Sequence, residues 1–199
     1  RAAQRASDLI KQILRFSRHS IVKTEPVKVS QIIEECLQLI RASLPSSIEI
    51  IPFIKHSSGV ALIDATQMHQ VMMNLASNAG HAMCENGGKL YVTVENITLE
   101  GENIPTANGL PPGEYIRITV RDTGHGMSEA TVRHIFDPYF TTKDEGIGTG
   151  LGLAVVKNII LAASGAVTVE SELGKGSSFY IYIPRVNDEA KENSNNVQP

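Results

Sequence analysis

The chain has 199 residues, of which 42% are hydrophobic, and this length suits one domain with its own core and short accessory segments. Its formal net charge of -3 and its lack of a long basic tract argue against a surface for nucleic acid or anionic lipid. Cys36 and Cys84 form neither a CxxC pair nor a cluster with histidines, so we expect reduced thiols in a cytoplasmic domain and no cysteine metal site.

Residues 2–18 place apolar side chains at mostly helical spacing, which predicts one N-terminal helix. The apolar face of this helix packs either on its own domain or on a partner helix in a bundle or dimer, and the spacing leaves both arrangements open. The chain begins without Met and without a signal-like segment, so we expect it to be part of a longer protein, with or without a membrane anchor.

The region from residue 25 to residue 88 combines short apolar runs with two helical patterns. Ser30 is expected to cap the first helix, which Pro45 ends. Asp64 opens the spacing of a capping box and predicts a long helix through Met83. The strands expected around these helices span residues 27–29, 48–54 and 60–63.

The second half of the domain contains alternating apolar and polar residues at 90–94 and 115–120, which predict an antiparallel pair joined by a long polar loop. Further elements are expected at residues 128–135 and 150–163 (helices) and 167–169 and 179–183 (strands). Helices mixed with mostly antiparallel strands predict a two-layer α/β sandwich over residues 25–186. It is preceded by residues 1–24 and followed by a polar linker at 187–199.

A strand-ending carboxylate is the first candidate for binding chemistry. Asp122 ends an alternating strand and precedes the turn Thr123-Gly124-His125-Gly126. Its acceptor-only side chain suits the exocyclic amine of adenine. An ordinary strand-ending turn is the structural alternative, because Asp and Gly are common turn residues.

Two carboxamides form the second candidate. Asn74 and Asn78 are four residues apart and therefore share one helical face. Because a nucleotide-bound Mg²⁺ needs only one or two protein oxygens, Asn78 is a candidate metal ligand. The alternative is a pair of exposed or capping amides.

Four alternating glycines form the third candidate, immediately before an apolar helix: Gly146, Gly148, Gly150 and Gly152. Glycines let backbone N–H groups approach phosphate, and the positive end of a helix dipole favours its charge. A flexible linker would not need the apolar residues Ile147 and Leu151 between these glycines. The three candidates together predict ATP binding under a glycine-rich lid.

Five segments resemble, in order, the sequence boxes of sensor histidine kinases with their Bergerat-type ATP-binding fold. The N box, first glycine box, F box, second glycine box and last glycine box correspond to residues 74–79, 122–127, 136–140, 146–153 and 174–179. The resemblance implies that Asp122 binds adenine, that Asn78 helps to hold magnesium, and that Asn74 lies near the phosphates. It also implies a base pocket shaped by Gly124 and Gly126.

The same resemblance assigns residues to the rest of the nucleotide site. Ser177 stands where the family commonly has Thr, as a polar neighbour of adenine. Phe136 and Phe140 anchor the lid, or serve simply as core aromatics. The residues implied for the phosphates are Gly148, Thr149, Gly150, Leu151 and Gly152. Lys143 and His81 are further candidates near the phosphates, with a solvent-exposed lysine as the plain alternative for Lys143.

Residues 5–18 resemble the second helix of the dimerisation and phosphoacceptor hairpin, especially in hybrid kinases that continue into a receiver domain. None of the six histidines has the His-(Glu/Asp) context expected of an acceptor. The resemblance therefore implies transfer of the γ-phosphoryl group of ATP to a histidine outside this chain. It implies as partners the acceptor hairpin, a receiver domain or response regulator, and a second copy in a homodimer.

The residues leave two other functions open. A clamp ATPase of the same fold, as in gyrase, mismatch-repair proteins or heat-shock chaperones, carries Glu at the position of Asn74 to activate water, and Asn cannot act as that base. A nucleotide-binding module without transfer activity is the other alternative.

Overall fold

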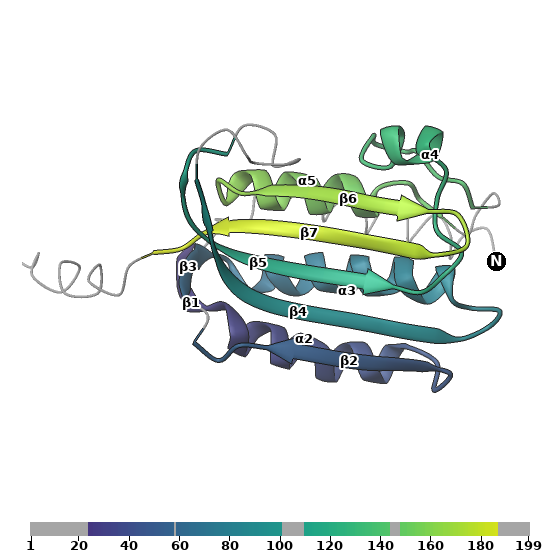
Figure 1. The fold of residues 1–199 in the computed structure, drawn as a ribbon, viewed down its shortest axis with the longest axis horizontal. Coiled ribbons are helices and arrows are strands. Elements are labelled where there is room, and N and C mark those ends of the chain that lie inside the picture. The colour runs from purple at the N-terminus through teal and green to yellow at the C-terminus, as the bar shows by residue number, and fades with distance from the viewer. Residues whose placement is uncertain (1–23, 58, 101–109, 144–147, 187–199) are drawn as a thin grey trace, which may run out of the picture.

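A main sheet and a layer of helices form the body of the domain in the computed structural model, which describes residues 24–57, 59–100, 110–143 and 148–186 (Figure 1). The sheet has five strands, in the spatial order β2 (Ile48–Ile54), β4 (Gly88–Leu99), β5 (Gly113–Asp122), β7 (Gly176–Pro184) and β6 (Ala166–Glu172). The β2–β4 pair is parallel and the other three pairs are antiparallel. The predicted two-layer α/β sandwich with a mixed, mostly antiparallel sheet is confirmed.

Three helices cover one face of this sheet (Figure 1). They are α2 (Val29–Ser43), α3 (Ala65–Ala82) and α5 (Gly152–Ala162). The short helix α4 (Glu129–His134) lies near the end of β6, and β1 (Glu25–Lys28) pairs with β3 (Val60–Ile63) in a separate two-stranded sheet. No helix in the described ranges is long and apolar enough to cross a membrane.

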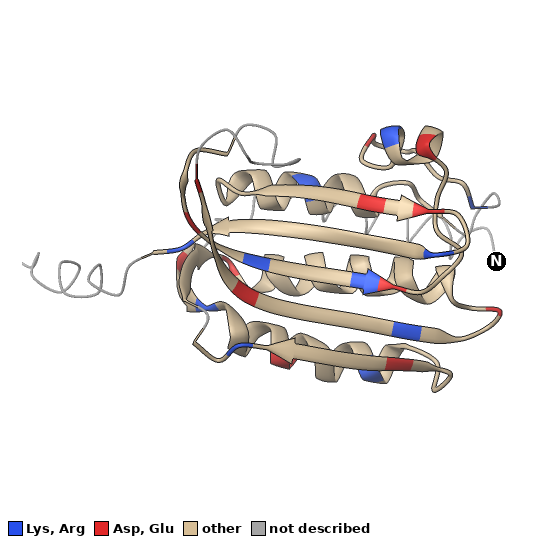
Figure 2. Cartoon of the chain, viewed as in Figure 1, with Lys and Arg blue, Asp and Glu red and all other residues tan. Residues whose placement is uncertain are grey.

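The core lies between the helices and the inner face of the sheet. Alternate residues of β4 and β5, such as Leu90, Val92, Ile116 and Ile118, are fully buried there. Burial of one such side chain contributes about 1.5–3 kcal/mol to the free energy of unfolding. Charged residues of both signs are scattered along the strands and helices, as the colours of Figure 2 show. The buried residues of α3 belong to this core, so the helix that carries both candidate asparagines is packed against the sheet.

The start of α3 is as predicted. Asp64 is its N-cap, and the carboxylate Oδ1 accepts hydrogen bonds from the backbone N–H groups of Thr66 at 2.8 Å and Gln67 at 3.2 Å. The helix ends at Ala82, and Gly87 then turns the chain with a φ of 66°. The capping signal therefore located the helix that carries the site.

Two predicted helix starts were wrong. The N-cap of α2 is Lys28 rather than Ser30, and Ser30 is buried inside the first turn. Helix α5 begins at Gly152 rather than Gly150, because Gly150 has a left-handed φ of 65° that no helical residue adopts. The predicted N-terminal helix and the polar linker lie outside the described residues.

Candidate nucleotide site

A buried carboxylate marks one end of the site. Asp122 is the last residue of β5 and only 4% exposed. Its Oδ1 accepts the backbone N–H of Gly124 at 2.8 Å and of Ser177 at 3.3 Å. Burial raises the pKa of Asp122, and these two hydrogen bonds and the neighbouring His125 partly oppose that rise. Both bonds use Oδ1, so Oδ2 is left to meet a donor in the pocket.

The turn after Asp122 is clamped between α3 and the β6–β7 connection. His125 donates its backbone N–H to the carbonyl of Ala82 at 3.1 Å and accepts from the N–H of Gly174 at 2.8 Å. A Cβ on Gly124 would lie 2.6 Å from the Cβ of Ala82, so only glycine fits there. Gly126 has a φ of 66° and packs on the carbonyl of Glu172. The two glycines of the first box are thus required by the backbone.

Sequence reasoning missed Ser171, which joins this turn to the last glycine box. Its hydroxyl accepts the backbone N–H of Met127 at 2.9 Å, donates to the carbonyl of Gly176 at 3.0 Å, and lies 2.9 Å from the hydroxyl of Ser177. Ser177 itself is buried and pairs directly with Ser171 across β6 and β7. A serine in a strand carries no sequence signal for such contacts, although Ser171 lies three residues before the last glycine box.

Both candidate asparagines face the lid side of the domain. Asn74 donates from Nδ2 to the carbonyl of Gly152, at the first residue of α5, over 3.2 Å. Asn78 accepts at Oδ1 from the ammonium group of Lys143 over 3.4 Å. Burial lowers the pKa of Lys143. Four predicted site residues from three segments are therefore brought together.

The second glycine box leads directly into α5. A Cβ on Gly150 would lie 2.5 Å from the carbonyl oxygen of Tyr139, whose own N–H donates to the carbonyl of Gly150 at 2.9 Å. The hydroxyl of Thr149 accepts the backbone N–H of Leu151 at 3.4 Å. Gly148 packs on Thr141 and Lys143. Residues 144–147, which include Gly146, lie outside the described residues.

The aromatic residues of the F box attach the lid to the core. Phe136 and Phe140 are partly buried and pack on the main hydrophobic cluster. The ammonium group of Lys157 lies 6.0 Å from the ring centroid of Phe136, and the ring of His134 lies 5.7 Å from that of Phe140. In contrast, Tyr139 between them is 74% exposed. Both phenylalanines therefore have the core contacts of an anchor.

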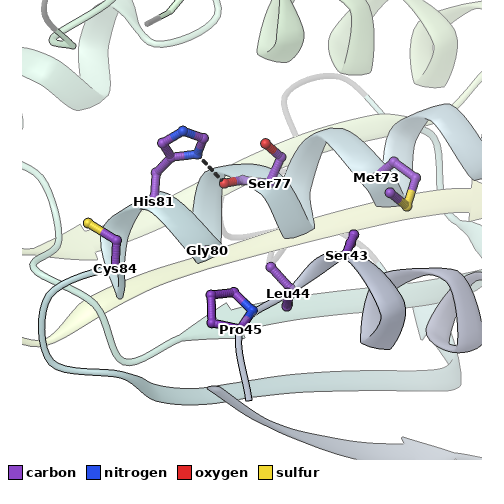
Figure 3. Close-up of a pocket in the computed structure, with 8 residues that line it drawn as sticks. All are labelled: Ser43, Leu44, Pro45, Met73, Ser77, Gly80, His81 and Cys84. Atoms are coloured by element: carbon purple, nitrogen blue, oxygen red, sulfur yellow. Dashed lines mark hydrogen bonds between the residues drawn. The ribbon is translucent and has the colours of Figure 1, made fainter. Parts of the chain in front are cut away.

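His81 lies at the edge of a separate cavity of about 330 Å³ between the end of α2 and the flank of α3 (Figure 3). The cavity is lined by Ser43, Leu44, Pro45, Met73, Ser77, Gly80, His81 and Cys84. The imidazole Nδ1 of His81 is 2.6 Å from the carbonyl of Ser77 in its own helix. This cavity does not include Asp122, Asn74 or Asn78, so it is not the predicted nucleotide site.

Oxygen ligands for a metal are sparse in the site. Among the described residues, no group of three or more His, Cys, Asp or Glu side chains could hold a metal ion. The single amide oxygen of Asn78 is the protein donor that the arrangement offers. Such a site suits a cation that arrives with most of its ligands already in place, as Mg²⁺ does on nucleotide phosphates.

Known proteins are similar to this chain in sequence and in fold. Residues 63–187 match the family described as histidine kinase-, DNA gyrase B- and HSP90-like ATPase. Sensor kinase CckA of Brucella abortus is 36% identical over 198 residues, and sensor histidine kinase ZraS of Klebsiella oxytoca is 32% identical over 193 residues. These alignments cover 95% and 96% of this chain but only 20% and 38% of the relatives, so the chain spans well under half of their length.

Solved structures of histidine kinases share the architecture. Full-length ShkA in complex with AMPPNP superimposes with a TM-score of 0.66 and 26% identity, over 83% of this chain and 32% of ShkA. The nucleotide-free catalytic domain of histidine kinase ThkA superimposes with a TM-score of 0.63 and 27% identity, over 81% of this chain and 95% of that domain. The chain therefore belongs to the histidine kinase-, DNA gyrase B- and HSP90-like ATPase family, with sensor histidine kinases among its relatives.

Proposed function

We propose that this domain binds magnesium ATP and donates the γ-phosphoryl group to a histidine in a separate helical hairpin of the parent protein. The main support is that one face of α3 contacts two segments. Asn74 contacts Gly152 at the start of α5, and Asn78 contacts Lys143 in the lid. The same helix ends against the turn that holds Asp122. The proposed base pocket and phosphate segments thus both contact one helix.

The base pocket centres on Asp122. Its Oδ1 is held by two backbone N–H groups, which fixes the carboxylate plane, and Oδ2 then accepts the exocyclic amine of adenine. Asp122 is buried, so little water competes with the amine for the carboxylate, and the hydrogen bond is stronger for that reason. Gly124 and Gly126 keep the turn close enough to form the wall of the pocket.

The phosphates are assigned to the segment from Gly148 to Gly152. The first turn of α5, an eleven-residue helix, offers backbone N–H groups without helical partners, and its dipole favours negative charge. We assign Thr149 and Leu151 to the same phosphate-binding segment. Lys143 adds a positive charge on the lid side, and we assign it to the γ-phosphoryl group. His81 stays a weaker candidate, since its ring nitrogen is engaged with Ser77.

Mg²⁺ fits this site through Asn78, whose amide oxygen is a suitable hard donor. When bound, the ion neutralises the developing charge on the phosphates, which is the main demand of phosphoryl transfer. Asn74 holds the start of α5 through its amide nitrogen and so positions the phosphate segment. Because Asn74 has no basic oxygen to activate water, the site favours transfer to an acceptor over hydrolysis.

The acceptor and the remaining partners follow from the relatives. CckA and ZraS are named as sensor kinases, and this chain corresponds to a fraction of each. We assign residues 5–18 to the second helix of the acceptor hairpin, in a homodimeric parent protein that passes the phosphoryl group to a receiver domain or response regulator. A cytoplasmic location of the domain follows from its need for ATP.

A transfer assay tests the proposal. The chain is incubated with γ-labelled magnesium ATP and the separately produced acceptor hairpin of the parent protein, and acid-labile phosphohistidine is expected on the hairpin. Asp122→Ala is the control that should remove the signal. ATP hydrolysis that needs no hairpin would favour a clamp ATPase. Tight ATP binding without transfer at any magnesium ATP concentration would leave a nucleotide-binding module.

A further inference from the structure

The hydroxyl of Ser171 reaches three groups of the base pocket from outside every recognised sequence box. It contacts the backbone N–H of Met127, the carbonyl of Gly176 and the hydroxyl of Ser177 at 2.9, 3.0 and 2.9 Å. Met127 belongs to the first glycine box and the other two to the last one. Ser177 in turn donates its backbone N–H to Asp122. Ser171 is therefore one hydrogen bond away from the wall that carries the base-binding carboxylate.

The directions of these bonds follow from the inventory of a hydroxyl group, which has one proton and two acceptor lone pairs. The backbone N–H of Met127 can only donate, so it occupies one lone pair of Ser171. The carbonyl of Gly176 can only accept, so it takes the proton of Ser171. The remaining contact then requires Ser177 to donate its own proton to the second lone pair of Ser171. With this assignment all three contacts are satisfied at once.

A consequence for Ser177, which we assign to the neighbourhood of adenine, is that its hydroxyl proton is used by Ser171 and its oxygen can act only as an acceptor there. Asp122 is an acceptor as well, so this wall carries two acceptors and no free hydroxyl proton. An exocyclic amine has two N–H groups and matches such a wall, whereas a carbonyl oxygen at the same ring position is repelled.

We propose that Ser171 is a positioning residue that holds the Ser177 hydroxyl as an acceptor and thereby makes the base pocket select a 6-aminopurine over a 6-oxopurine. The inference rests on the proposed nucleotide site and adds a determinant of its base specificity. Ser171 does not touch the base itself. It acts through the proton of Ser177, and loss of Ser171 frees that proton to rotate toward a carbonyl oxygen.

The test compares the affinities of ATP and inosine triphosphate, which carries a 6-oxo group in place of the 6-amino group. Calorimetry is performed on the whole chain with Ser171→Ala, and with Ser171→Thr as the matched control that keeps the hydroxyl. We expect Ser171→Ala to reduce the preference for ATP by about three- to tenfold, the value of one hydrogen bond, and Ser171→Thr to keep it. A merely structural role would weaken both nucleotides by the same factor, and that result would overturn the proposal.

Ser177→Ala provides a second route if Ser171→Ala fails to fold. It removes the acceptor oxygen while keeping the contacts of Ser171 with Met127 and Gly176, and it too should narrow the preference for ATP. An unchanged preference in Ser177→Ala would reject the inference. These outcomes are separable from failure of the proposed function, because a wild-type chain that binds no ATP rejects both, whereas ATP binding with unaltered base preference rejects only the role of Ser171.

Discussion

The ammonium group of Lys143 lies 3.4 Å from Oδ1 of Asn78, the same amide oxygen that we assign to Mg²⁺. The two residues are 65 positions apart in the chain, so the contact ties the lid to helix α3. A cation on this oxygen opposes the approach of a second one. Lys143 therefore holds a positive charge beside the oxygen at which the metal is expected.

Replacement of Lys143 by Met should make magnesium binding easier. The measurement uses a fixed concentration of ADP, which has no γ-phosphoryl group for Lys143 to contact. The Mg²⁺ concentration that gives half-maximal ADP binding should fall by about two- to fivefold, because the repulsion between Mg²⁺ and the partly exposed ammonium group is removed. Transfer from ATP to the acceptor hairpin should fall as well, because the positive charge near the γ-phosphoryl group is lost.

Thr142→Ala is the matched control for this prediction, since Thr142 is an exposed neighbour of Lys143 in the lid. It should leave the Mg²⁺ dependence unchanged. If Lys143→Met also leaves that dependence unchanged, the contact with Asn78 has no bearing on the metal.

Asp122→Asn should change how stability depends on pH. Burial raises the pKa of Asp122 above its unfolded value of about 3.9, so the folded state binds more protons between these two values. The free energy of unfolding of the wild type therefore falls as pH rises through this interval, and the cost of the buried charge is present above it. Asn keeps the oxygen that accepts from Gly124 and Ser177 but has no proton to lose, so this downward slope should be absent.

The measurement is chemical denaturation of both proteins at a series of pH values. The affinity of Asp122→Asn for ATP should drop by about ten- to a hundredfold at neutral pH. The variant has an amide nitrogen in place of the carboxylate oxygen Oδ2 that accepts from adenine, and it also lacks the negative charge. Identical pH profiles for the two proteins would show that Asp122 does not ionise in a buried environment.

Local signals in the sequence were sufficient to predict the ends of two elements that position the candidate site. Asp64 has an acceptor side chain directly before a helical pattern, and it caps α3. Asp122 ends an alternating strand and precedes glycines, and it ends β5. In each case the end of the element depends on residues within four positions of it, and a local sequence pattern covers that range.

Contacts over long sequence separation could not be predicted in this way. Ser171 and Met127 are 44 positions apart, and nothing in either local pattern specifies their hydrogen bond. The parallel pairing of β2 with β4 is a further example, because alternation predicts which face is buried and not which strand is adjacent. Ser30 failed as a cap for a related reason: the fold buries its side chain in the first turn of α2, where it cannot serve as the N-cap.

Asp64→Ala should destabilise the domain without altering the nucleotide site directly. The variant loses the acceptor for the backbone N–H groups of Thr66 and Gln67, which is worth about 0.5–2 kcal/mol in the free energy of unfolding. Urea denaturation measures this loss, and ATP affinity below the transition should match the wild type. Asp64→Ser restores an acceptor and should recover most of the stability. Equal destabilisation by Ala and Ser would mean that capping is not the cause.

Gly150→Ala should disturb the lid, whereas Gly152→Ala should be tolerated by the fold. Gly150 has a φ of 65°, and its Cβ would press on the backbone of Tyr139, so the variant must shift the junction between the F box and α5. Adoption of a left-handed conformation by Ala costs about 1–2 kcal/mol before any clash is counted. At Gly152 a Cβ would lie 3.7 Å from the side chain of Asn74, an ordinary contact, and Ala favours the first turn of a helix.

Thermal unfolding and calorimetry with ATP separate the two glycines. Gly150→Ala should lower both the melting temperature and the affinity for ATP, since the phosphate segment starts from a displaced position. Gly152→Ala should keep or raise the melting temperature, so any loss of ATP affinity in that variant reports on the approach of phosphate to the backbone. A wild-type melting temperature for Gly150→Ala would contradict the structural role of Gly150, because the left-handed turn and the contact with Tyr139 leave no room for a methyl group.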